Sequence, residues 1–126
     1  MQQGNTDVAK IEKQLIDARG GKEADLRARM AKALVSQAAD EYKQDHVDQA
    51  EVLLKKALSE CERATTVAIA AGKKEKTVEI RLREISHRVN EIARLVPFDD
   101  RVHLEEARHS VETLRTKLLD HMFKKK

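Results

Sequence analysis

The chain has 126 residues, of which 37% are charged, 40% hydrophobic and only 2% aromatic, and its net charge is +3. This length fits one domain, and a charged, aromatic-poor composition with one Pro and four Gly argues against a turn-rich sheet protein. Basic and acidic residues are interspersed and Trp is absent, so we do not expect nucleic acid as a partner.

The apolar spacing predicts a short first helix over residues 7–19, which ends at a Gly-Gly pair. Its stripe consists of Val8, Ile11, Leu15 and Ala18, at spacings of three and four residues. Gly20 and the glycine after it end the helix and form a flexible joint. We expect this helix to cover an edge of the fold or to extend away from it.

Residues 22–71 predict a helical hairpin whose apolar positions are mostly alanine. Small side chains let two helices approach closely, so this part of the fold should be thin. Cys61 falls on the stripe of the second arm and is expected to be a small buried hydrophobe. The second stripe is unbroken: Val47, Ala50, Leu54, Ala57, Cys61, Ala64, Ala68, Ala71.

Residues 73–123 predict a second hairpin with larger apolar residues in heptads. Its two arms meet at Pro97, and we expect Phe98 to plug the hairpin end. Unbroken heptads can close within one chain or between chains, so a homo-oligomer through 73–123 is one alternative. The stripes are Val78, Leu82, Ile85, Val89, Ile92, Val96 and Leu104, Ala107, Val111, Leu114, Leu118, Met122.

Together these segments predict an all-α fold. We expect an antiparallel bundle of four long helices plus the short first helix, forming a single domain over residues 1–126 with a basic tail at 124–126. No apolar run approaches the roughly 20 residues of a membrane span. A polar N-terminus and a lone cysteine predict a cytoplasmic protein, although a leader peptide that had been removed would leave no trace in this sequence.

Residues 35–58 resemble one tetratricopeptide repeat. In that family two helices pair through small and large residues at the offsets seen here. The resemblance implies binding of a peptide or another protein along a helical groove, and the candidate binding residues are Leu34, Ala38, Tyr42, Leu54 and Leu58. The matching positions are Val35, Ala38, Ala39, Tyr42, Ala50, Leu54, Ala57 and Leu58.

Residues 82–89 are similar to the phospho-acceptor helix of one class of sensor histidine kinases. That family places an exposed His on the first helix of a helical hairpin, and the helical phase puts His87 on the polar face of its helix. The resemblance implies that His87 would accept a phosphoryl group, with Glu84 as a neighbouring acid or base. A histidine phosphotransfer protein is therefore the alternative function.

Two Glu-x-x-His patterns, ending at His87 and His109, are typical of di-iron bundles if they face inward. Here the heptad phase turns both patterns outward, so no metal site is predicted. No phosphate-binding loop or nucleophile motif occurs either. We therefore expect no cofactor, no catalytic residue and no small-molecule substrate, and interpret the chain as a non-enzymatic adaptor, assembly factor or chaperone-like module.

Overall fold

The computed structural model describes the backbone of residues 3–124 and the side chains of residues 7–124. This part of the chain is entirely helical between short turns, which confirms the all-α prediction. None of the described helices carries an apolar stretch long enough to cross a lipid bilayer. The helices are α1 (Gln3–Leu15), α2 (Gly20–Lys43), α3 (Val47–Ala71), α4 (Glu75–Leu95) and α5 (Phe98–Lys124).

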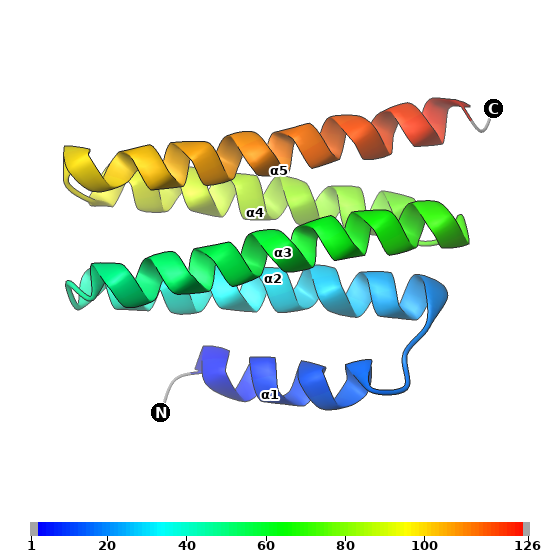
Figure 1. The fold of residues 1–126 in the computed structure, drawn as a ribbon, viewed down its shortest axis with the longest axis horizontal. Helices are drawn as coiled ribbons and strands as arrows, with labels where there is room; N and C mark the ends of the chain where they lie inside the picture. The colour runs from blue at the N-terminus through cyan, green and yellow to red at the C-terminus, as the bar shows by residue number, and fades with distance from the viewer. Residues whose placement is uncertain (1–2, 125–126) are drawn as a thin grey trace.

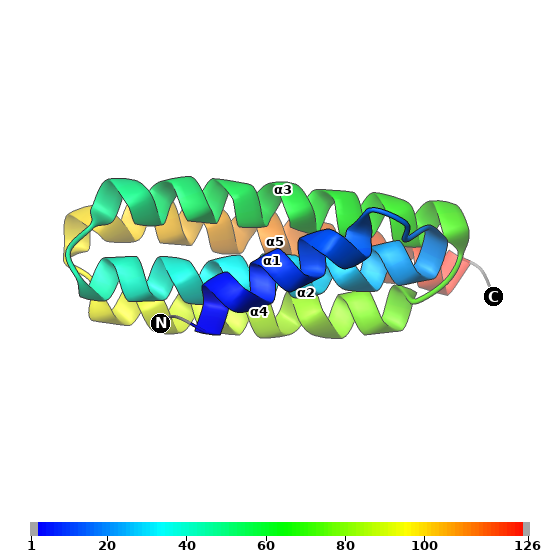
Figure 2. The same cartoon turned by 90° about the horizontal axis from the view of Figure 1, so that it is seen from below.

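The four long helices form a bundle of two hairpins, with α1 on its outside (Figures 1 and 2). The hairpin of α2 and α3 packs on that of α4 and α5, so that α2 lies beside α4 and α3 beside α5. Successive long helices run in opposite directions, whereas the neighbours α2 and α4 run parallel, as do α3 and α5 (Figure 1). The bundle therefore stacks one hairpin on the next, and α1 packs against α2.

The first helix is displaced from its predicted range of 7–19. It begins at Gln3 and ends at Leu15, because the next amides of Ile16 and Ala18 bond three residues back, to Lys13 and Leu15. Such bonds tighten the chain into a turn. Ala18 continued the apolar spacing and is buried, but it belongs to this turn and not to the helix.

The turns explain the other boundary differences. Gly72 ends α3 in the left-handed conformation with φ of 65°, and Lys74 adopts φ of 64°, so α4 begins at Glu75 and not at residue 73. Gly21, at the start of α2, lies so close to this turn that a Cβ there would stand 3.0 Å from Lys74 and 3.1 Å from Lys73. At the other end, Lys124 closes α5, while residues 125–126 of the predicted basic tail lie outside the described part.

Both predicted seams form the core of the single chain. Every residue of the α4 stripe is buried, as are four of the six on α5, where Leu114 and Met122 are half-buried. The heptads of 73–123 are thus covered by α2 and α3 of the same chain, and an oligomer through this hairpin would need other surfaces. The alanines at the α2–α3 contact are also buried: Ala24, Ala28, Ala31, Ala38, Ala50, Ala57, Ala64 and Ala68.

The end of the bundle is not plugged by Phe98, as the sequence suggested. Phe98 is the first residue of α5 and its side chain is 76% exposed. Tyr42 fills this end instead: it lines a small hollow with Ile92 and Val96 of the other hairpin. The first position of a helix can point away from the core, and the turn at Pro97 places Phe98 there.

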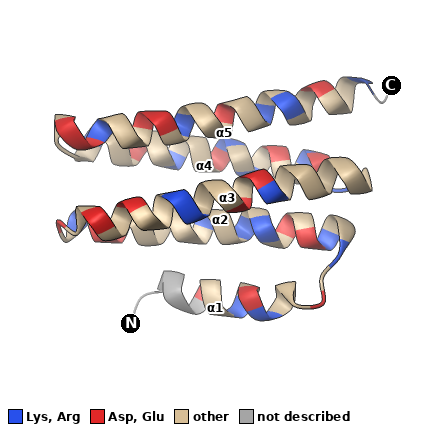
Figure 3. Cartoon of the chain, in the orientation of Figure 1, with Lys and Arg blue, Asp and Glu red and all other residues tan. Residues whose placement is uncertain are grey.

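Ion pairs join the hairpins along their polar edges, and charges of both signs alternate on the helices (Figure 3). Lys32 with Glu84 and Arg81 with Asp25 are two such pairs between α2 and α4.

Within the second hairpin, a further cluster links α4 to α5, where Arg115 donates to Glu79 at 2.8 Å and 3.0 Å and Arg83 donates at 3.0 Å. Burial alone would raise the pKa of Glu79, but the hydrogen bonds from Arg115 and Arg83 hold it below its ordinary value. Glu79 is 5% exposed, so its charge depends on these arginines.

Candidate functional site

A depression with apolar walls lies on the surface between α3 and α5. Two adjoining hollows of about 250 Å³ and about 310 Å³ share Leu58 and Ser110, and they form one continuous depression, here named the α3–α5 groove. Leu54 and Leu58 of α3 and Ala107 and Leu114 of α5 supply its apolar part. Apolar walls with a few polar groups along the rim are the usual composition of a protein binding site.

Helical periodicity explains why these side chains meet. Leu54 lies on the α3 seam and is buried, and Leu58, one turn later, is half-buried at the edge that faces α5. On α5, Ala107 and Leu114 are seven residues apart on the same seam. Because Ala107 is small, it leaves room beside Leu54 and Leu58, and the groove occupies this room.

The rim of the α3–α5 groove carries charge of both signs. At one end, His103 Nε2 lies 3.3 Å from Glu51 Oε2 across the groove, and His103 Nδ1 lies 3.8 Å from Glu106 Oε1. At the other end, Glu62 of α3 faces Lys117 of α5. The rim can therefore meet both donors and acceptors of a peptide, and it does not select one sign of charge.

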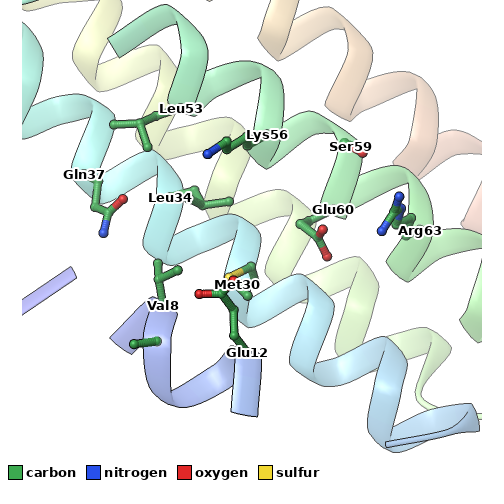
Figure 4. A pocket seen from close by; sticks show the side chains of 11 residues that line it. Val8, Glu12, Met30, Leu34, Gln37, Leu53, Lys56, Ser59, Glu60 and Arg63 are labelled. Atoms are coloured by element: carbon green, nitrogen blue, oxygen red, sulfur yellow. The ribbon is translucent and has the colours of Figure 1, made fainter. Parts of the chain in front are cut away.

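Two further hollows flank α1. One, of about 470 Å³, opens between α1, α2 and α3, and the other, of about 400 Å³, lies between α1, α2 and α4. Figure 4 shows the first from close by, with Val8 of α1 opposite α2 and with side chains of α3 above them. Its apolar wall consists of Val8, Met30, Leu34 and Leu53, and its charged lining of Glu12, Lys56, Glu60 and Arg63.

The five predicted binding residues are spread over four places. Leu54 and Leu58 line the α3–α5 groove, whereas Leu34 lines the hollow beside α1. Ala38 is fully buried between helices, so its side chain has no surface to offer a partner. Tyr42 is half-buried at the end of the bundle.

Tyr42 has an unusual environment for a phenol. Its hydroxyl is buried, and no hydrogen-bond partner for it lies among the described residues. Burial raises its pKa to about 12, and the charges of Glu51 and Asp100 add to this shift. Tyr42 therefore stays neutral at ordinary pH, and its ring lies against the hollow between α2 and the end of α4.

The α5 side of the groove was not predicted as a binding surface. His103 and Ser110 lie beside the heptad seam, and nothing in a single sequence tells which edge of a helix stays uncovered. Leu114 was predicted as a seam residue, and its half-burial is the signal that it also reaches the groove. The arrangement of one hairpin on the other decides this, since it packs α3 more extensively against α5 than against α4.

Candidate catalytic groups are placed as their helical phase predicts. Cys61 is fully buried, and burial, with smaller contributions from Glu60 and Glu62, raises its pKa to about 12, which keeps the thiol protonated. His87 and Glu84 are exposed on α4, and His109 and Glu106 are exposed on α5. Among the described residues, no group of three or more His, Cys, Asp or Glu is arranged to hold a metal ion.

Comparison with known proteins yields no relative. No protein-family model matches the chain, and no curated protein and no solved structure is similar to it.

Proposed function

We propose that this chain is a non-enzymatic protein–protein interaction module, and that it binds a peptide segment of another protein in the α3–α5 groove. The observation that carries the proposal is the continuity of the groove: its two hollows share Leu58 and Ser110 and run along both helices. A peptide could place apolar side chains against Leu58 and Leu114 and direct its polar groups to the rim. Adaptors and chaperone-like modules capture segments in this way.

The stacking of the two hairpins supports the proposal. With α2 parallel to α4 and α3 parallel to α5, one hairpin lies on the next, as in helical-repeat proteins (Figure 1). The resemblance of residues 35–58 to a tetratricopeptide repeat is compatible with this arrangement. Leu54 and Leu58, which belong to that resemblance, both line the groove.

The test compares two substitutions on α3. Leu58→Lys places a charge in the groove, whereas Val52→Lys changes a residue that is 53% exposed and lines neither hollow of the groove. Proteins retained by the immobilised chain from an extract are identified and purified, and their binding is measured by calorimetry. We expect Leu58→Lys to weaken binding about tenfold or more and Val52→Lys to leave it unchanged.

Whether the Leu58→Lys variant folds can be measured separately from whether it binds. A half-buried lysine can extend its ammonium group to water, so circular dichroism should show that Leu58→Lys keeps its helices. Equal binding by the wild-type chain and a folded Leu58→Lys variant would contradict the proposal, as would equal losses in both variants.

A second candidate function is histidine phosphotransfer at His87. The exposure of His87 on a helical bundle favours it, since a phospho-acceptor must be reached by its phosphodonor. Incubation with acetyl phosphate should then produce an acid-labile phosphate that is absent in His87→Gln. Peptide binding by an interaction module should not change with His87→Gln. If the wild-type chain is not labelled, phosphotransfer is contradicted and only the interaction module remains.

A further inference from the structure

The short helix α1 is an amphipathic helix seated on the bundle from outside. It packs on α2 through one apolar stripe, in which Ile11 is 5% exposed and Val8 and Leu15 are half-buried (Figure 2). Ion pairs such as Arg27 with Glu60 and Arg115 with Glu79 join the long helices to one another. The face of α2 beneath α1 therefore already binds one amphipathic helix.

The connection between α1 and α2 can let α1 leave without disturbing α2. Ile16 in this connection is 71% exposed, and Gly20 has a positive φ of 59°, which glycine adopts at little cost. Gly21 is buried close to Lys73 and Lys74 of the α3–α4 turn. Movement at residues 16–20 would expose Ala18, which is 3% exposed in the folded chain, but it would leave α2 from Gly21 onward packed on the bundle.

The surface on both sides of α1 is rich in cations. The two hollows beside it are lined from the long helices by five basic side chains and one carboxylate, that of Glu60, which Arg27 already holds at 2.9 Å. Lys32 and Arg81 have carboxylate partners on neighbouring helices. The other three, Arg29, Lys56 and Arg63, form no ion pair with a described residue.

The charges of α1 match this surface only in part. Glu12 lines the first hollow together with Lys56 and Arg63, which is a favourable combination (Figure 4). On the other side α1 presents Asp7 but also Lys10, and Lys10 shares its hollow with Arg29, Lys32 and Arg81. A helix with an acid in place of Lys10 would complement both sides.

We propose that the α1-covered face of α2 is a second docking surface, and that it accepts an acidic amphipathic helix of a partner protein in exchange for α1. The partner helix would repeat the apolar spacing of Val8, Ile11 and Leu15 and carry acids where α1 carries Lys10. It would bind antiparallel to α2, as α1 does (Figure 1). This surface is separate from the α3–α5 groove, and the inference does not depend on that groove.

The test uses the full chain and two fluorescein-labelled peptides of residues 3–19, one with the natural sequence and one with Lys10→Glu. Two isoleucines give a matched pair of variants, since Ile11→Asp unseats α1 and Ile16→Asp changes only the exposed connection. Fluorescence anisotropy measures peptide binding. We expect the Ile11→Asp chain to bind the Lys10→Glu peptide about tenfold more tightly than the Ile16→Asp chain does, because α1 of the Ile11→Asp chain no longer competes with the peptide. The Lys10→Glu peptide should bind more tightly than the natural one, and Arg29→Glu should remove this preference.

Other results would overturn the inference. If Ile11→Asp stays helical by circular dichroism but binds neither peptide, the face is not a docking surface. Equal binding of the two peptides would contradict an acidic partner helix. A wild-type dimer that Ile11→Asp abolishes would assign the face to a second copy of the chain.

If Ile11→Asp does not fold, amide hydrogen exchange of the wild-type chain provides the test. A saturating concentration of the Lys10→Glu peptide should speed amide exchange in α1, because the peptide displaces α1. Unchanged amide exchange would contradict the displacement of α1 by a partner helix. Leu58→Lys should bind the peptides as wild type does, which separates this test from that of the groove.

Discussion

The two hairpins solve the same packing problem with different side chains. The α2–α3 hairpin closes largely over alanine, and its backbones approach closely, whereas the α4–α5 hairpin closes over valine, isoleucine and leucine with fewer close backbone approaches. In the first hairpin, close packing requires side chains small enough to let the helices approach. In the second, it requires side chains large enough to fill the wider space between the helices. The two halves should therefore be sensitive to opposite substitutions.

The largest expected effect is the loss of volume from the second hairpin. Leu82 is fully buried on the α4 seam, so Leu82→Ala should lower the free energy of unfolding by about 2–5 kcal/mol. Urea denaturation followed by circular dichroism measures this. Leu95→Ala is the control, because Leu95 lies on the same helix and is 75% exposed. Similar losses in both variants would show that α4 is not packed as described.

The opposite change should disrupt the first hairpin. Ala64 of α3 is fully buried against α2, and Ala64→Leu should lower the free energy of unfolding by about 1–3 kcal/mol because the helices must move apart. Ala70→Leu, at an exposed position of α3, is the control and should change stability little. A stabilised Ala64→Leu variant in the same denaturation experiment would mean that the alanine contact contains unfilled space.

The Glu79 cluster should make the second hairpin sensitive to acid. The folded-state pKa of Glu79 lies below its ordinary value of 4.5, so its contribution to stability is present above that pH and is lost as pH falls through the folded pKa. Glu79→Gln should cost about 1–2 kcal/mol at neutral pH. Thermal melts from pH 7 to pH 3 should show the wild type approaching the variant as acid is added. A constant difference in melting temperature between wild type and variant over this range would contradict the role of the Glu79 charge. Glu84→Gln serves as the control, because Glu84 belongs to an exposed ion pair with Lys32.

The smallest expected effect concerns the junction of the hairpins. Tyr42 is the one tyrosine of the chain, so ultraviolet absorbance reports its titration alone. Because burial and the charges of Glu51 and Asp100 oppose ionisation, we expect an apparent pKa of about 12 in the folded chain. Asp100→Asn should lower this value slightly. A wild-type value near 10 would place Tyr42 in water and leave the end of the bundle without its plug.

The sequence was sufficient for the helices and for their buried faces. Heptad spacing identified the seams correctly, because a helix must bury an apolar stripe wherever the stripe is long and unbroken. It failed at the ends: Ala18 kept the spacing but lies in a turn, and Phe98 was taken for a plug although it points outward. At such positions local hydrogen bonds and the direction of the turn decide, and apolar periodicity does not describe them.

The candidate site was predicted only in part for a different reason. Leu54 and Leu58 were identified because they belong to a helical-hairpin pattern, and both line the α3–α5 groove. Ala38 belongs to the same pattern and is buried, since a pattern of apolar residues does not distinguish packing from binding. The α5 wall with His103 and Ser110 depends on which hairpin faces lie together, and that is a property of the whole chain.

The heptad seams close within one chain, so a partner would have to bind at the outer grooves. Light scattering of the wild-type chain from low micromolar to near-millimolar concentration tests it most directly. We expect the mass of one chain throughout this range. A stable dimer that becomes a folded monomer in Val111→Asp, a substitution in the fully buried α5 seam, would contradict it, because the seam would then close between chains.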